Sequence, residues 1–397
     1  MVGVLVGFGV GADAILFPSA PGAAWLDREV GAMTTFNMQT FASGKPGAAP
    51  AASAFSPFGN VSLPDSWMEA TVAFGAQYNV FVADHFSGFN LWYSDAWSGS
   101  GVAEYDLRAA NFGRDILSDF VASAASAGVA KGLFYSVHEN WQWGVGEYVT
   151  PNASEQQRFN DFNARQLTAL LNGSYGNATA PWSEVWFDAG VLTAVAPQIG
   201  PVVRKFAPTA MCHSCGNFSG EGMGLRWMGN EEAVMPLPNW NAVQGQAYCG
   251  SSPAPNNNDY KGDENGTLFC PASCDTPLRE HYWFWKPNTE HTIKSVSTLV
   301  TNYLTSVGRG CNLILNIAPD TTGLVPASDM ARYHQFGAAI ALLTSKPLQI
   351  ASNPPLTASH TSHASPPLLT ATIPIPATPA TKNLTVVVME DLVGFGQ

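Results

Sequence analysis

Short apolar runs that end in polar residues recur along this chain, and helical patterns separate them. The run Val185–Phe187 is followed at once by Asp188 and then by Gly190, which can turn the chain. Such a run is short enough to form a buried parallel strand with an acidic residue at its carboxyl end. Taken alone, an Asp in this position more often caps the next turn than takes part in chemistry.

The same alternation extends over most of the chain. We expect further strands at Glu29–Phe36, Tyr78–Ala83, Lys131–Val137, Thr209–His213, Leu225–Met228 and Cys311–Ile317. We expect helices over residues 65–77, 107–127, 155–171, 192–206, 289–307 and 329–343. This order predicts an α/β fold in which a (β/α)₈ TIM-like barrel closes on itself. A doubly wound sheet is the second choice, because no glycine-rich phosphate loop follows the first strand.

The composition divides the chain into four parts. Residues 1–24 are rich in Gly, Ala and Pro, and we interpret them as a leader or N-terminal arm. Residues 25–345 carry the predicted barrel, and residues 346–380 form a Pro/Ser/Thr-rich linker without periodicity. Residues 381–397 contain one strand-like run, Thr385–Asp391. Because one strand cannot stand alone, we expect the truncated start of a C-terminal β-sandwich.

The charge pattern excludes some classes of partner. The net charge is −12 and no basic run occurs, so a nucleic acid partner is excluded. No stretch has the length and purity of a membrane span. Six cysteines and seven glycosylation sequons favour an oxidising compartment, secreted/extracellular or vacuolar-lysosomal, although no clear signal peptide is present. The sequons begin at Asn60, Asn152, Asn172, Asn177, Asn217, Asn265 and Asn383.

The cysteines are more typical of disulfides than of a metal or redox site. Cys212 and Cys215 have the spacing of half a zinc site, but Cys270 and Cys274 do not repeat that spacing. The disulfide connectivity stays open at this stage.

The expected strand ends bring carboxylates, histidines and tryptophans together. A sugar ring stacks on aromatic faces, and its hydrolysis requires two carboxyl groups. His85, His138 and Asp188 also leave a metal hydrolase open, but no His-x-His or His-Glu-x-x-His spacing supports it. We therefore predict a sugar site with no metal and no organic cofactor.

Seven segments in consistent order resemble the α-L-fucosidases of glycoside hydrolase family 29, in particular the plant-like subgroup. They are EVGAMTTFNMQTF (29–41), YNVFVADHFSGFNLWYS (78–94), GLFYSVHENW (132–141), VWFDAG (185–190), RWMGNE (226–231), CPASCDTPLREHYWFW (270–285) and SVGRGCNLILNIAPDTTG (306–323). The resemblance implies a retaining exo-glycosidase that acts on fucosylated oligosaccharides or glycoproteins. Asp188 matches the position of the nucleophile, and Glu231 matches that of the acid/base. We expect the substrate to be bound by His85, Trp92, Tyr135, His138, Trp186 and Trp285, of which His85 and Trp186 stand at positions that match the family.

Several positions depart from the family pattern. Thr35 stands where the family has a fucose-binding His, and Phe86 replaces one His of a pair. A Glu-Trp pair of the first loop is replaced around Gly44–Pro46, and Ser273 stands in place of a Glu. Loss of groups that bond hydroxyls weakens recognition. A related glycosidase for another sugar, or a catalytically silent carbohydrate-binding barrel, therefore remains an alternative.

Overall fold

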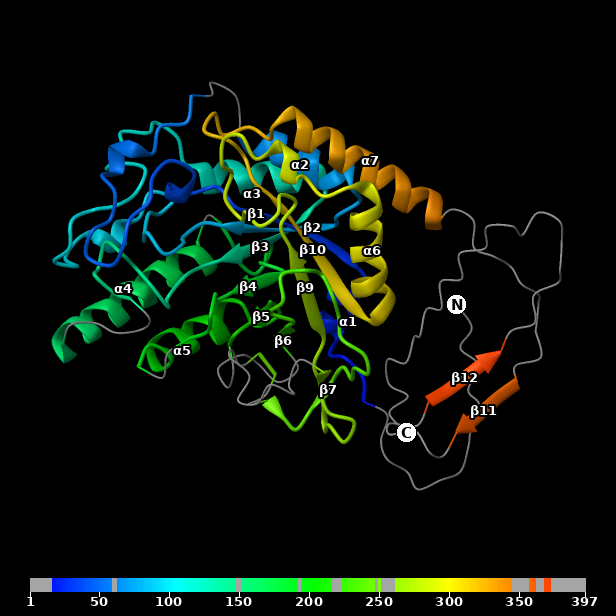
Figure 1. Ribbon diagram of the computed structural model, residues 1–397. Coiled ribbons are helices and arrows are strands. Elements are labelled where there is room, and N and C mark those ends of the chain that lie inside the picture. The colour runs from blue at the N-terminus through cyan, green and yellow to red at the C-terminus, as the bar shows by residue number, and fades with distance from the viewer. Residues whose placement is uncertain are drawn as a thin grey trace.

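Eight parallel strands form a closed barrel in the computed structural model of the chain (Figure 1). The structure describes residues 16–58, 63–146, 152–173, 175–191, 194–215, 223–246, 249–250 and 261–344, and two later strands. Around the barrel the order is β1-β10-β9-β6-β5-β4-β3-β2. The strands are β1 (Val30–Thr34), β2 (Tyr78–Val82), β3 (Ala130–Phe134), β4 (Glu184–Trp186), β5 (Met211–His213), β6 (Gly224–Trp227), β9 (Ala272–Thr276) and β10 (Cys311–Ile317). The predicted barrel is confirmed.

Helices surround the strands on the outside of the barrel (Figure 1). They are α1 (Ala20–Leu26), α2 (Leu63–Ala73), α3 (Ile116–Ala127), α4 (Ala153–Leu171), α5 (Ala196–Phe206), α6 (Val296–Ser306) and α7 (Ala327–Thr344). The side chains of Asp115, Asn152 and Ser295 accept backbone N–H groups at the starts of α3, α4 and α6. These caps fix where the three helices begin. No helix in the described part of the chain is long and apolar enough to cross a membrane.

Three predicted boundaries differ from the structure for local reasons. The helix expected over 107–127 begins only at Ile116, because Asp106 accepts the backbone N–H groups of Arg108 and Ala109 in a turn. The helix expected over 289–307 begins at Val296, after its cap. The predicted arm 1–24 contains the start of α1, whose Trp25 is fully buried.

Five of the described strands lie outside the predicted set: β9, the two-residue strands β7 (Ala242–Val243) and β8 (Leu268–Phe269), and a later pair. The sequence of β9 has no branched aliphatic residue, although the whole strand is buried. A hairpin of β11 (Thr357–Thr361) and β12 (Leu368–Thr372) lies within the predicted linker, in segments whose threonines favour extended backbone. The expected strand Thr385–Asp391 lies outside the described residues.

Side chains alternate between the inside of the barrel and the helical layer. Inside the barrel, Tyr78, Val80, Phe134, Trp186 and Ile314 belong to one apolar cluster. The alternate residues of the same strands pack outward against the helices, mainly α2 to α5 in one cluster and α6 and α7 in another. This alternation follows from the two-residue period of a strand, and it leaves the strand ends open for polar groups.

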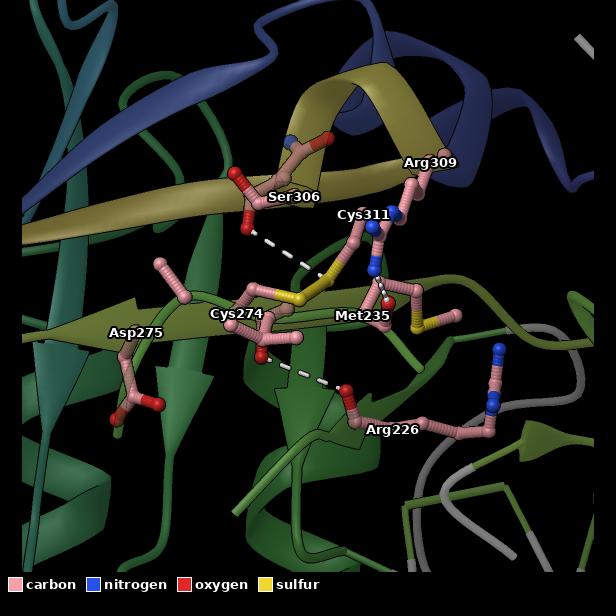
Figure 2. Close-up of a disulfide and its surroundings, with 12 residues drawn as sticks. Arg226, Met235, Cys274, Asp275, Ser306, Arg309 and Cys311 are labelled. Atoms are coloured by element: carbon pink, nitrogen blue, oxygen red, sulfur yellow. Dashed lines mark hydrogen bonds between the residues drawn. A yellow bond between two sulfur atoms is a disulfide. The ribbon is translucent and has the colours of Figure 1, made fainter. Parts of the chain in front are cut away.

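The six cysteines form three disulfides, which settles the connectivity that the sequence left open. The pairs are Cys212–Cys215, Cys249–Cys270 and Cys274–Cys311. Figure 2 shows the bond between Cys274 and Cys311, which joins the neighbouring strands β9 and β10 beside Met235. The side chain of Asp275 points away from this bond.

Removal of the Cys274–Cys311 disulfide should lower the free energy of unfolding by about 2–4 kcal/mol, because the bond restricts the unfolded chain. Urea unfolding of the Cys274→Ala/Cys311→Ala variant measures this loss. The matched control is Cys249→Ala/Cys270→Ala, in which the cysteines are 21 rather than 37 residues apart, so its loss should be smaller. An unchanged urea midpoint in the first variant would contradict the expectation.

Candidate active site

Three acidic side chains gather at the carboxyl ends of neighbouring barrel strands. Asp188 follows β4, Glu231 follows β6, and Asp275 lies near the end of β9. The strands β4, β5, β6 and β9 are consecutive neighbours in the barrel, and all of them are parallel. Their ends therefore meet on the face where TIM-barrel chemistry is placed. The negative charges of the three groups act on one another.

Asp188 titrates far above an ordinary Asp. Burial raises the pKa of Asp188 from 3.8 to about 6, and the negative charge of Glu231 adds to the rise. A hydrogen bond from the backbone N–H of Ala189 opposes it. Two carboxylates in one site resist simultaneous ionisation, which is the condition that a nucleophile and an acid require.

Asp275 is a third carboxyl group that the sequence reasoning missed. Burial raises its pKa from 3.8 to about 7, while the Trp227 Nε1–H bond to its carboxylate, 2.8 Å long, acts in the opposite direction. The charges of Glu231 and Asp188 raise the pKa further. The available signal was an acidic residue within the family segment Cys270–Trp285, but without a recognised strand it could not be placed.

The backbone is in the left-handed region at or beside two of these groups. The φ angle is 53° at Glu231 and 52° at Ala189, directly after Asp188. Non-glycine residues adopt this region rarely and at a cost, and they do so most often at functional sites. The loop of Glu231 is held by Thr276, whose hydroxyl donates to the Glu231 carbonyl at 2.9 Å, and by Asn302, whose amide donates to the Glu232 carbonyl at 2.6 Å.

The side chain of Glu231 is partly exposed, and among the described residues it forms one side-chain hydrogen bond. Its Oε2 lies 2.8 Å from Nε2 of His281, whose Nδ1 lies 3.0 Å from Glu280. No residue in this arrangement other than Glu231 was predicted from the sequence.

His85 and His138 lie close to each other. The ring of His85 stacks on Phe134 and meets Phe284 edge-on, while Gln39 lies 2.9 Å from its Nδ1. Burial, and then the nearby His138, lower the pKa of His85 to about 3. His85 is therefore neutral at physiological pH, which suits a partner for sugar hydroxyls.

The predicted tryptophans and tyrosine fall into different layers. Trp186 lies inside the barrel and stacks on His213 with ring centroids 3.8 Å apart. Trp285 is partly exposed in the segment after β9. Trp92 and Tyr135 are buried in the helical layer, where the Tyr135 hydroxyl donates to Asn163 of α4 at 2.7 Å. The structure thus brings neither Trp92 nor Tyr135 to the acidic cluster.

Two residues at positions that depart from the family pattern form hydrogen bonds within the barrel. The hydroxyl of Thr35 donates to the carbonyl of Trp283 and accepts the amide of Asn316 at 2.7 Å. Ser273 is fully buried in β9, with its hydroxyl 3.4 Å from the carbonyl of Arg226. Among the described residues, no three His, Cys, Asp or Glu side chains lie together in a way that could hold a metal ion.

Together, the closed barrel and its cluster of carboxyl groups define a TIM-barrel protein with a site of the glycoside hydrolase type. The alpha-L-fucosidase family profile matches residues 25–342, and the chain belongs to this family. This membership confirms the resemblance found in the sequence.

Individual relatives agree with the family. A provisionally assigned alpha-L-fucosidase 1 of Oryza sativa subsp. japonica is 28% identical over 281 residues, 68% of this chain and 48% of the relative. Alpha-L-fucosidase 1 of Arabidopsis thaliana is 25% identical over 280 residues, 68% of this chain and 50% of the relative. The chain therefore spans about half the length of these curated relatives. A crystal structure of a provisionally assigned alpha-L-fucosidase from Bacteroides thetaiotaomicron superposes with a TM-score of 0.72 at 27% identity, covering 87% of this chain and 79% of that one.

The raised pKa of Asp275 predicts how stability depends on pH. The native state keeps a proton that the unfolded chain loses, so this group costs stability as the pH rises from about 4 to about 7. Asp275→Asn removes that cost. Relative to the wild type, the variant should gain on the order of 3 kcal/mol between pH 4 and pH 8.

Urea unfolding of both proteins at the two pH values measures this difference. The exposed Asp161 on α4 provides the control, since Asp161→Asn should show no such gain. An Asp275→Asn variant whose stability relative to the wild type is the same at pH 4 and pH 8 would contradict the burial of an ionisable group here.

Proposed function

We propose that this chain is a retaining exo-glycosidase that releases terminal α-L-fucose from fucosylated oligosaccharides or glycoproteins. The observation that carries the proposal is the interaction of Asp188 with Glu231 at two strand ends of one barrel face. Family membership over residues 25–342 supports fucose as the sugar.

In this mechanism Asp188 attacks the anomeric carbon, and a glycosyl-enzyme forms. Glu231 gives a proton to the leaving oxygen and, in the second step, takes one from the attacking water. Asp188 must be ionised to attack. Because its pKa is about 6, the rate should fall as the pH decreases below that value.

We propose that the sugar lies between the acidic cluster and the pair His85 and His138, with Trp186 and Trp285 as apolar contacts. The neutral imidazole of His85 supports a role in bonding hydroxyls. Trp92 and Tyr135 support this wall from the helical layer, because Tyr135 follows Phe134, on whose ring His85 stacks.

A different sugar is the second candidate. Thr35 and Ser273 have their hydroxyls engaged with backbone carbonyls and do not replace the groups that the family pattern places there. A panel of aryl glycosides tests this candidate, and preferred turnover of a sugar other than fucose would establish it. Binding of glycans without any turnover would instead favour a silent carbohydrate-binding barrel.

A compartment of the secretory route fits the three disulfides. We propose that the protein is secreted or vacuolar and carries glycans on its sequons. Expression in a eukaryotic secretory system, followed by treatment with an endoglycosidase, would show a decrease in mass if this is correct.

Asp188→Ala should reduce kcat on nitrophenyl α-L-fucoside by about a thousandfold or more, because no nucleophile remains to form the glycosyl-enzyme. The matched control is Glu232→Ala, which removes an exposed carboxylate one position from Glu231 and should retain activity. If the folded wild-type protein turned over no fucoside at all, the proposal of a fucosidase would be wrong.

Glu231→Ala should affect substrates according to their leaving group. Nitrophenolate leaves without a proton, whereas an oligosaccharide alkoxide needs one. The loss in kcat/KM should therefore be about a hundredfold or more larger on the oligosaccharide than on the nitrophenyl substrate. Comparison of both substrates with the wild type measures the difference. Equal losses on the two substrates would show that Glu231 is not the acid.

A further inference from the structure

A row of four charged side chains leads from the flank of the barrel to Glu231. The Lys294 ammonium lies 2.7 Å from Oε2 of Glu280, and Oε1 of Glu280 lies 3.0 Å from Nδ1 of His281. The row ends at Nε2 of His281, 2.8 Å from Oε2 of Glu231. Both ring nitrogens of one histidine therefore face carboxyl oxygens at hydrogen-bonding distance.

The chemistry of imidazole limits how the protons are arranged in this row. A carboxylate has no proton to donate, so Glu280 requires an N–H on Nδ1. Nε2 can then carry a proton and donate it to ionised Glu231, or it can accept the O–H of protonated Glu231. The two arrangements contain the same number of protons and differ only in which partner holds one.

From this geometry we propose that His281 is a positioning residue which exchanges one proton with Glu231 and so sets the protonation state of the acid/base. The Nε2–H bond breaks as an O–H bond forms on Glu231, and no other group is transferred. Glu231 then gives this proton to the leaving oxygen and recovers one from the attacking water. This inference rests on the proposed function of Glu231.

Glu280 and Lys294 hold the ring in the required orientation. Lys294 is largely buried and also donates to the carbonyl of Pro277 at 2.7 Å, so its position is fixed. Its hydrogen bond is the main reason that the pKa of Glu280 is lowered, which keeps Glu280 ionised. A third group that orients a histidine through Nδ1 is the arrangement used by catalytic triads.

The charges facing His281 favour the imidazolium. Partial burial works against the charged ring, but the hydrogen bonds with Glu280 and Glu231 outweigh it and raise the pKa of His281 above 6.5. Behind Glu231, the negative charges of Asp188 and Asp275 act on the same cluster. The imidazole of His281 therefore keeps its proton to a higher pH than an isolated histidine.

The first test does not depend on activity. Titration of the His281 imidazole by NMR should give a midpoint above 6.5 in the wild type. Each of the variants Glu231→Gln and Glu280→Gln should lower that midpoint by about half a unit or more, since each removes one facing charge. The His281 signal is the one missing in His281→Gln, and His334→Gln on the exposed side of α7 identifies a control signal. A midpoint at or below 6.5, or one unchanged in Glu231→Gln, would overturn the proposal.

The second test is the pH dependence of kcat/KM on a fucosylated oligosaccharide. In His281→Gln the alkaline limb should move to lower pH by about one unit or more, because Glu231 must then hold its proton alone. Glu280→Gln should move it in the same direction, and His334→Gln should leave it in place. An alkaline limb at the wild-type position in His281→Gln overturns the inference while leaving the fucosidase intact. Absence of turnover by the wild type would instead refute the proposed function, and the titration would still decide the pairing.

Discussion

Parallel pairing of four consecutive barrel strands brings the acidic groups of this protein together. Asp188, Glu231 and Asp275 are far apart in the sequence, but β4, β5, β6 and β9 lie side by side and point the same way. Inside the barrel, apolar side chains fill the space below these strand ends. The carboxyl groups consequently lose much of their hydration, and burial is the largest cause of the raised pKa values of Asp188 and Asp275.

The barrel could be predicted from the sequence because most of its strands are short runs of apolar residues. Val80 and Ile314 lie in strands of this type, and their patterns cannot be confused with a loop. The sequence of β9, Ala-Ser-Cys-Asp-Thr, lacks that signal, although its neighbours β6 and β10 bury it completely. Tertiary context alone makes it a strand, and for this reason Asp275 could not be placed in the site.

The sequence suggested candidate site residues only where they lie in a recognisable motif. Asp188 and Glu231 were proposed as the catalytic pair from the family segments, and their strand ends lie on one face of the barrel. His85 and His138, each proposed from its own segment, lie close to each other. Tyr135 was expected to face the sugar, but a strand residue alternates sides, and in this register its hydroxyl reaches Asn163 of α4. No sequence pattern indicates the role of His281, because its contact with Glu231 joins residues 50 positions apart in the chain.

The charges of the three carboxyl groups and of His281 act on one another in the candidate site. Burial and mutual repulsion raise the pKa of Asp188 and of Asp275, so these two groups keep their protons to a higher pH than exposed Asp side chains do. A retaining glycosidase needs one carboxylate without a proton and one with it, and repulsion alone does not decide which group keeps the proton. Within the described residues, Glu231 alone of the three lies at hydrogen-bonding distance from an imidazole, and the proposed role of His281 is to distinguish Glu231 from the other two through this contact. Glu280 and Lys294 hold the imidazole in place behind Glu231, through contacts of 3.0 Å between His281 and Glu280 and of 2.7 Å between Lys294 and Glu280.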